Sequence, residues 1–100
     1  MKKSLDLVFK EEANIEFMEA FLYYEEQLEG LGERFLNEID RTILSINLSP
    51  KGFQIFNKKN GTRQIPMDVF PFVIIYKVIE KQLIIFAVFK TPQDPIKKNR

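Results

Sequence analysis

Three residues in the C-terminal half carry side chains that could act on a phosphate group. Arg63 presents a planar guanidinium that can hold two phosphate oxygens at once. Lys90 could stabilise developing negative charge, or donate a proton if burial lowered its pKa, and Tyr76 could donate a proton weakly. Each also has a structural interpretation: an exposed arginine beside a turn, a solvated lysine at a strand end and a core tyrosine in an apolar run. Both interpretations stay open for all three.

A second group of candidates consists of bases that could contact the phosphates of a nucleic acid or an acidic stretch of a partner protein. They gather around one hairpin, at the end of the last strand and in the C-terminal segment: Lys51, Lys58, Lys59, Arg63, Lys90, Lys97 and Lys98. Aromatic residues are not interleaved with these bases as in a typical RNA-binding motif, so nucleic-acid binding depends on charge alone. The alternative is an ordinary solvated surface.

The composition excludes several classes of site. The 100 residues include no cysteine, which rules out disulfides, thiolate zinc sites and cysteine nucleophiles. They include no histidine, which removes the commonest general base and the imidazole metal ligands. We expect no metal, no cofactor, no small-molecule substrate and a cytoplasmic location. We also expect no contact with a membrane, since the uncharged run at 69–76 is far shorter than the roughly 20 residues of a membrane helix.

Charge is unevenly distributed along the chain. Residues 1–40 hold eleven acidic and four basic residues, and residues 41–100 hold three acidic and eleven basic residues. The formal charges of −7 and +8 add up to the net charge of +1. If the two halves fold as separate layers, the protein has one acidic and one basic surface, which would guide its association with charged partners.

Helical periodicity begins at residue 11 and ends before Pro50. The first apolar stripe recurs at steps of three and four residues: Ala13, Phe17, Ala20, Phe21 and Tyr24. The second stripe does the same: Phe35, Ile39, Ile43 and Ile46. The glycines at 30 and 32 predict a tight break, and hence an antiparallel helix pair. The acids of the first helix are expected to lie mostly on its hydrated side: Glu12, Glu16, Glu19 and Glu26.

Strand patterns occupy the rest of the chain. Residues 4–9 and 53–58 alternate between apolar and polar side chains, and Asn60-Gly61 predicts a type I′ turn leading into a partner strand at 62–67. Residues 73–79 and 83–89 form nearly continuous apolar runs joined by a polar turn at Glu80-Lys81. Such runs are typical of strands covered on both faces.

These elements predict a single α+β domain over residues 1–100. An N-terminal strand precedes an antiparallel helix hairpin, which packs on one face of a mainly antiparallel sheet with a meander of three or four strands. Residues 91–100 are expected to form an extended or mobile tail.

The order of these motifs resembles that of the RelE/ParE family of toxins along essentially the whole chain. The segments that carry the resemblance are YYEEQ at 23–27, LG at 31–32, FLNE at 35–38, Arg63, FPFVIIY at 70–76, and FAVF at 86–89 followed by Pro95. Two departures stand out: Phe72 replaces the usual tyrosine, and Lys90 and Gln93 occupy the places where many relatives have a histidine and an arginine.

The resemblance implies the toxin of a type II toxin–antitoxin pair, neutralised by a cognate antitoxin protein. ParE-like members block DNA gyrase and are not enzymes acting on RNA, whereas RelE-like members cleave mRNA on the ribosome. The helix-hairpin motif is closer to ParE-like sequences. If the chain is instead a ribonuclease, its candidates are Arg63, Lys90 and Tyr76. The departures at Lys90 and Gln93 leave a third possibility, a non-toxic binding module of the same fold.

Overall fold

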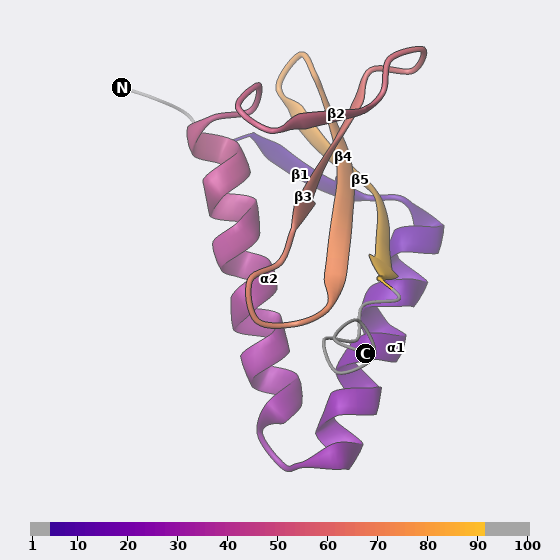
Figure 1. Ribbon diagram of the computed structural model, residues 1–100, viewed down its shortest axis with the longest axis vertical. Coiled ribbons are helices and arrows are strands. Elements are labelled where there is room, and N and C mark those ends of the chain that lie inside the picture. Colours follow the sequence, from indigo (N-terminus) through magenta and orange to yellow (C-terminus); the bar gives the residue numbers. More distant parts are fainter. Residues whose placement is uncertain (1–4, 92–100) are drawn as a thin grey trace, which may run out of the picture.

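The computed structural model describes residues 5–91. Its elements are β1 (Asp6–Phe9), α1 (Glu11–Gln27), α2 (Leu31–Leu48), β2 (Gln54–Asn57), β3 (Thr62–Pro66), β4 (Phe72–Ile79) and β5 (Gln82–Lys90) (Figure 1). The predictions that concern Ser4, Lys97, Lys98 and the rest of the tail after Thr91 fall outside these residues.

The strands form one five-stranded sheet in the order β1-β5-β4-β3-β2. The four strands from β2 to β5 form an antiparallel meander, and β1 joins β5 in parallel. The predicted α+β fold is therefore confirmed, with four strands in the meander. The parallel pairing of the first strand with the last was not part of the prediction.

The helix hairpin is antiparallel, as predicted, and its loop is tightly built. Gly30 has φ +90, a conformation that glycine adopts without steric cost. Gly32 lies so close to α1 that an added Cβ would stand 2.9 Å from the carbonyl oxygen of Phe21. The Glu25 carboxylate accepts the N–H groups of Gly30 and Gly32 at 3.0 and 2.9 Å, and thereby satisfies free donors at the start of α2. No helix in the described part of the chain is long and apolar enough to cross a membrane.

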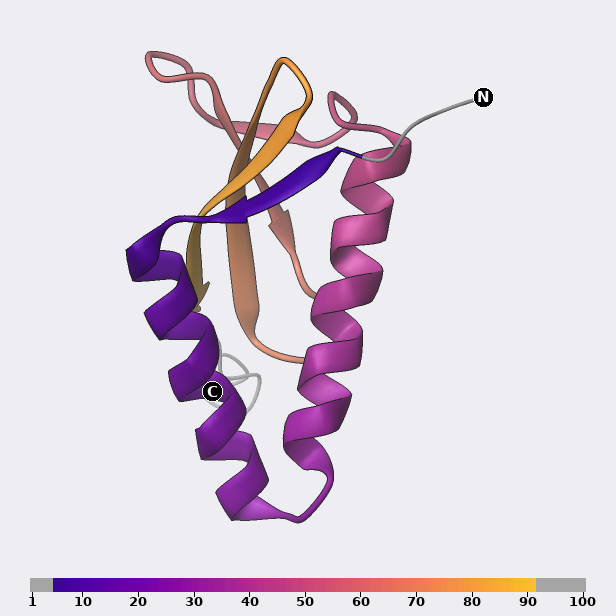
Figure 2. The same cartoon turned by 180° about the vertical axis from the view of Figure 1, so that it is seen from behind.

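The two helices diverge from this loop in a V shape, and in both views the strands are seen in the opening of the V (Figures 1 and 2). At the open end, β1 spans from the start of α1 to the end of α2 (Figure 2). The Leu5 N–H donates to Asn47 Oδ1 at 2.9 Å, which fastens the beginning of β1 to α2.

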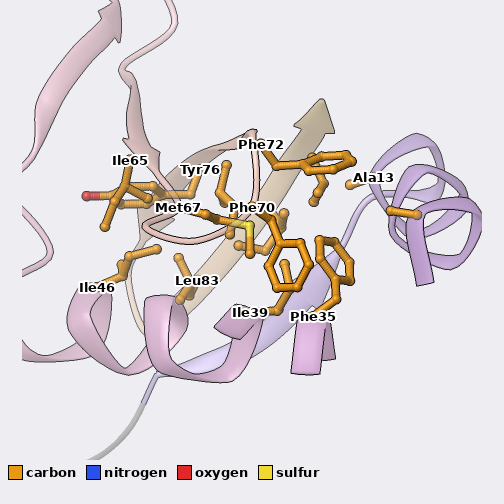
Figure 3. Packing of buried hydrophobic residues seen from close by; sticks show 14 residues of the cluster. Ala13, Phe35, Ile39, Ile46, Ile65, Met67, Phe70, Phe72, Tyr76 and Leu83 are labelled. Atoms are coloured by element: carbon orange, nitrogen blue, oxygen red, sulfur yellow. The ribbon is translucent and has the colours of Figure 1, made fainter. Parts of the chain in front are cut away.

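The core lies between the helices and one face of the sheet, and it includes a group of aromatic rings (Figure 3). Phe35 of α2 is fully buried and contacts the rings of Tyr24, Phe70 and Phe72 at centroid distances of 5.4, 5.2 and 5.3 Å. These distances are those of favourable aromatic pairs. The first five residues of β4 are buried on both faces of the sheet, as its continuous apolar run predicts.

The turn predicted at Asn60-Gly61 differs from the observed one. Residues 58–61 form a four-residue turn, in which the Gly61 N–H donates to the carbonyl oxygen of Asn57 at 2.9 Å. Gly61 has φ +75, but Asn60 does not have the positive φ that a type I′ turn requires at both central residues. The two-residue turn of the sheet is instead Glu80-Lys81, where Glu80 has φ 54.

One edge of the sheet is completed by a helix. β1 pairs with β5 only from Gln82 to Ile85, and α1 lies along the remainder of that edge. The Val88 N–H of β5 donates to Glu16 Oε1 at 2.7 Å. The expectation that Glu16 lies on the hydrated side of α1 is therefore wrong, since its carboxylate takes the place of a strand partner. Covering an edge with a helix is a common protection against unwanted strand pairing.

Candidate functional site

Two of the three candidate catalytic residues lie side by side in the sheet. Arg63 of β3 and Tyr76 of β4 are direct cross-strand partners. The Tyr76 side chain is fully buried, and its hydroxyl donates to the carbonyl oxygen of Pro50 at 2.8 Å. Arg63 Nη1 donates to the carbonyl oxygen of Phe53, also at 2.8 Å. Both side chains thus hold the segment that leads from α2 into β2.

The environment of Tyr76 favours its neutral form. Burial raises the pKa of the Tyr76 phenol above its ordinary value of 10.0, and the positive charge of Arg63 opposes part of this rise. The hydroxyl is therefore protonated at neutral pH and serves as a hydrogen-bond donor. It could not act as a base there.

A positively charged hollow of about 200 Å³ adjoins this pair. Three bases from different segments line it, namely Lys51, Arg63 and Lys77, and none of its described lining residues is acidic. Gly61 also borders the hollow, and a Cβ at this position would lie 3.4 Å from Lys77 Cε. The arrangement can attract an anion, but it contains no group suited to be a general base at neutral pH.

Lys90 lies elsewhere. Tyr76 pairs with Ile85 of β5, and Lys90 follows five residues later on the same strand. Lys90 is therefore roughly 16 Å along the strand direction from Ile85 and from its partner Tyr76. Lys90 Nζ instead stands 5.6 Å from the centroid of the Tyr23 ring on α1. Among the described residues, the three candidates do not meet at one point.

A groove of about 360 Å³ surrounds Lys90, between α1 and the end of β5. We call it the α1–β5 groove; its lining residues are Glu16, Glu19, Ala20, Tyr23, Tyr24, Phe72, Val88, Phe89 and Lys90. Tyr23 is 51% exposed at its rim. This mixture of exposed aromatic side chains with a few charged groups is typical of a surface that binds a peptide or another ligand.

The other bases of the predicted interface are spread out. Lys58 and Lys59 are exposed in the turn between β2 and β3, where the Lys59 N–H donates to Asn57 Oδ1 at 2.8 Å. Neither lines the hollow with Lys51 and Arg63. The predicted basic cluster is thus divided between the hollow, the turn and the α1–β5 groove, while Lys97 and Lys98 lie outside the described residues.

The face of β4 and β5 that points away from the core has few side chains that could take part in a reaction. Alternation and the cross-strand register place mainly apolar side chains there: Val73, Ile75, Ile84, Ala87 and Phe89, with Lys77 towards one end. Such side chains cannot transfer protons or hold a phosphate. In the part of the chain that the structure describes, no group of three or more acidic, histidine or cysteine side chains could hold a metal ion.

Glu16 and Glu25 have structural roles that the sequence analysis missed. Both are half-buried, and each accepts backbone N–H groups of another element. Glu16 precedes the buried Ala20 by one helical turn, which places it next to the core stripe. Glu25 lies in the last turns of α1 ahead of a glycine loop, where free N–H donors require an acceptor. These two positions in the sequence were the signals from which the roles of Glu16 and Glu25 could have been predicted.

Comparison with known proteins supports the fold. No protein-family model matches the sequence, and no curated protein matches it. Among solved structures, the chain is similar to one described as "Chromosomal ParDE TA system from P. aeruginosa", with a TM-score of 0.72. The match covers 87% of this chain and 96% of that chain at 13% sequence identity. The two chains therefore share an α+β fold over nearly their whole described length.

Proposed function

We propose that this protein is the toxin of a type II toxin–antitoxin system, neutralised by a cognate antitoxin protein, and that it acts in the ParE-like manner by inhibiting DNA gyrase in the cytoplasm. The observation that carries the proposal is the fold likeness, which extends over 96% of a chain from a ParDE system. The resemblance of the sequence motifs, from the helix hairpin to the last strand, points in the same direction.

The distribution of side chains favours binding over catalysis. The outward face of β4 and β5 is mainly apolar, Arg63 is engaged with the Phe53 carbonyl, and Lys90 is far from both Arg63 and Tyr76. A ribonuclease would need a base, an acid and a positive charge gathered around one phosphate. We therefore propose a protein that acts by contact, not an enzyme.

The α1–β5 groove is our candidate for the antitoxin contact. It offers a peptide the exposed rings of Tyr23 and Phe89, which are 51% and 36% exposed, and the charge of Lys90. Amphipathic segments commonly bind in grooves of this type, with their apolar side chains as anchors. The edge at this groove is occupied by α1, which favours a docked helix over an added strand.

A second candidate function is ribosome-dependent mRNA cleavage. The pairing of Arg63 with Tyr76, beside a hollow that Lys51 and Lys77 also line, is the observation that favours it. Arg63→Ala decides this case: a purified protein that cuts ribosome-bound mRNA as fast with this substitution as without it would exclude the assignment. The third candidate, a non-toxic binding module, is suggested by Lys90 and Gln93 at the family's histidine and arginine places.

The test is induced expression in a bacterial host, with and without the small reading frame next to the gene. We expect growth arrest, relief of the arrest by the neighbouring frame, and an induced DNA-damage response without cut transcripts. Lys90→Glu, which reverses the charge in the α1–β5 groove, should weaken the relief, whereas Lys59→Glu in the exposed turn should not. Normal growth would support the non-toxic module, and cut transcripts would support the ribonuclease.

A further inference from the structure

The first helix is apolar on two opposite sides. Ala13 and Ala20 are buried, and they belong to the stripe that faces the core. On the outer side, Ile15, Met18 and Leu22 are 48%, 45% and 55% exposed. A surface helix ordinarily has polar residues opposite its core stripe. The outer side of α1 therefore carries more apolar surface than the fold itself uses.

These three exposed residues form one continuous stripe. Their spacing of three and four residues places them within about 60° of one another around a helix with 3.6 residues per turn. Isolated apolar residues on a surface are normal, but a contiguous set indicates a binding surface. We refer to Ile15, Met18 and Leu22 as the outer stripe.

The charge around the outer stripe limits what can cover it. Between Glu11 and Gln27, α1 has six glutamates and no basic residue. Glu11, Glu19 and Glu26 lie beside the outer stripe by helical spacing. A second copy docked through the same helix would bring glutamates against glutamates, and an anionic membrane surface would also be repelled. A partner with positive charge gains most from this surface, since it adds charge attraction to the burial of the apolar side chains.

We propose that the outer stripe of α1 docks a basic amphipathic helix from a partner protein, with Ile15, Met18 and Leu22 as its anchors. Helices commonly associate through apolar residues at these spacings, and flanking opposite charges set the orientation. The outer stripe lies on the side of α1 away from the core, and none of its three residues lines the α1–β5 groove, although the neighbouring Glu19 does. Substitutions in the outer stripe therefore test this contact separately from toxicity and from the α1–β5 groove.

The experiment uses a synthetic peptide of about 18 residues, long enough for a helix in a complex. Leucines occupy one helical face and lysines the other, and a counter-probe has glutamates in place of the lysines. Binding to the full-length protein is followed by fluorescence anisotropy of the labelled peptide, and the site is mapped from amide chemical shifts. We expect the basic peptide to bind, to shift the amides around Met18, and to lose affinity with added salt.

The decisive variant is Ile15→Gln/Met18→Gln/Leu22→Gln, which should lower the affinity for the basic peptide by about tenfold or more. The matched control is Leu44→Gln/Leu48→Gln on α2, where two leucines are 58% and 68% exposed but lie outside the outer stripe. This control should change the affinity less than about twofold. Thermal unfolding of both variants shows whether they keep the fold.

Four results of the binding experiments would overturn the proposal, and a fifth comes from a separate vesicle experiment. These are absence of peptide binding, equal binding of the acidic counter-probe, an equal loss of affinity in the α2 control, and self-association of the protein that the triple substitution abolishes. Co-sedimentation with vesicles of phosphatidylcholine and phosphatidylglycerol that depends on the outer stripe would equally contradict it. Growth arrest in the expression test has no bearing on these outcomes, so the two proposals fail separately.

Discussion

On one side of the sheet, α1 follows β5 beyond the end of β1, and Glu16 accepts the Val88 N–H at 2.7 Å. On the other side, β2 has all four of its residues exposed, including Ile55 at 46% and Phe56 at 49%. The first edge is closed by a side chain from a helix, whereas no described strand or helix covers the outer side of the second. The comparison shows that the fold protects the edge beside the α1–β5 groove and leaves β2 available for contact.

The exposed edge is nevertheless held in place from within. The Tyr76 hydroxyl binds the Pro50 carbonyl, and Arg63 binds the Phe53 carbonyl, so both ends of the segment that enters β2 are fixed. The side chains that anchor this segment thus come from β3 and β4, and the backbone pairing of β2 with β3 adds to them. The two edges should respond differently to substitution for this reason.

The largest effect is expected at the closed edge. Glu16→Ala removes the acceptor of the Val88 N–H and should lower the free energy of unfolding by about 1–3 kcal/mol, because a shielded donor loses its partner. Glu19→Ala, with an exposed carboxylate on the same helix, is the matched control and should cost far less. Chemical denaturation measures both. Equal losses would mean that the hydrogen bond does not protect this edge.

A smaller loss is expected where the exposed edge is anchored. Tyr76→Phe keeps the buried ring but leaves the Pro50 carbonyl without its donor, and should lower the free energy of unfolding by about 1 kcal/mol. Amide exchange should accelerate in the segment leading into β2 more than at Val88. Uniform acceleration across the sheet would show that Tyr76 supports the core in general and not this edge.

The raised pKa of Tyr76 also predicts that the protein loses stability at alkaline pH. Because the pKa of Tyr76 is raised in the folded state above 10.0, the folded protein keeps this proton at a pH where the unfolded chain has lost it. Stability is therefore fully present below pH 10 and falls as the pH rises beyond it. Denaturation midpoints measured on either side of this pH should show a decline that Tyr76→Phe reduces. An identical decline in the variant would assign it to other groups.

The smallest effect is expected on β2 itself. Ile55→Thr/Phe56→Thr should change the free energy of unfolding by no more than about 0.5 kcal/mol, since neither side chain is buried and threonine is well accepted in strands. The solubility of the isolated protein should rise, because an exposed apolar edge promotes association. Light scattering at increasing concentration measures this. A large loss of stability would contradict the comparison between the two edges.

The parts of the fold that follow from local patterns could be predicted from the sequence. The helical stripes ending at Tyr24 and Ile46 recur with a period of about 3.6 residues, which strands do not satisfy. The apolar runs of β4 and β5 indicate strands because they are short, rich in β-branched residues and bounded by turn residues. The parallel pairing of β1 with β5 could not be predicted, because it depends on how the helix hairpin directs the following strands relative to β1. The prediction of a two-residue turn at Asn60-Gly61 was wrong because the bulge in β2, between Ile55 and Asn57, changes the register before the turn.

The candidate site was predicted only in part. Arg63 and Tyr76 were selected by their chemistry, and the sheet register makes them neighbours, but neither residue has a sequence signal for the carbonyl groups that it binds. Lys90 was grouped with them although strand geometry places it at another level of the sheet. Glu16 was assigned to the hydrated side because a carboxylate beside a core stripe has no apolar signature. In all three cases the outcome depends on contacts between elements that are distant in the sequence. The periodicity of a single segment carries no information about such contacts.

The parallel pairing of β1 with β5 has a consequence for how the protein is made. Asp6 is aligned with Gln82, so 76 positions separate the two partners along the chain. Contacts this remote form late, since a long loop must close before they gain any energy. During translation, the first strand has no strand partner until the last one has been synthesised. A chain cut short before β5 would therefore lack the strand that aligns β1 and the N–H group that fastens α1, and quality-control proteases should remove it quickly.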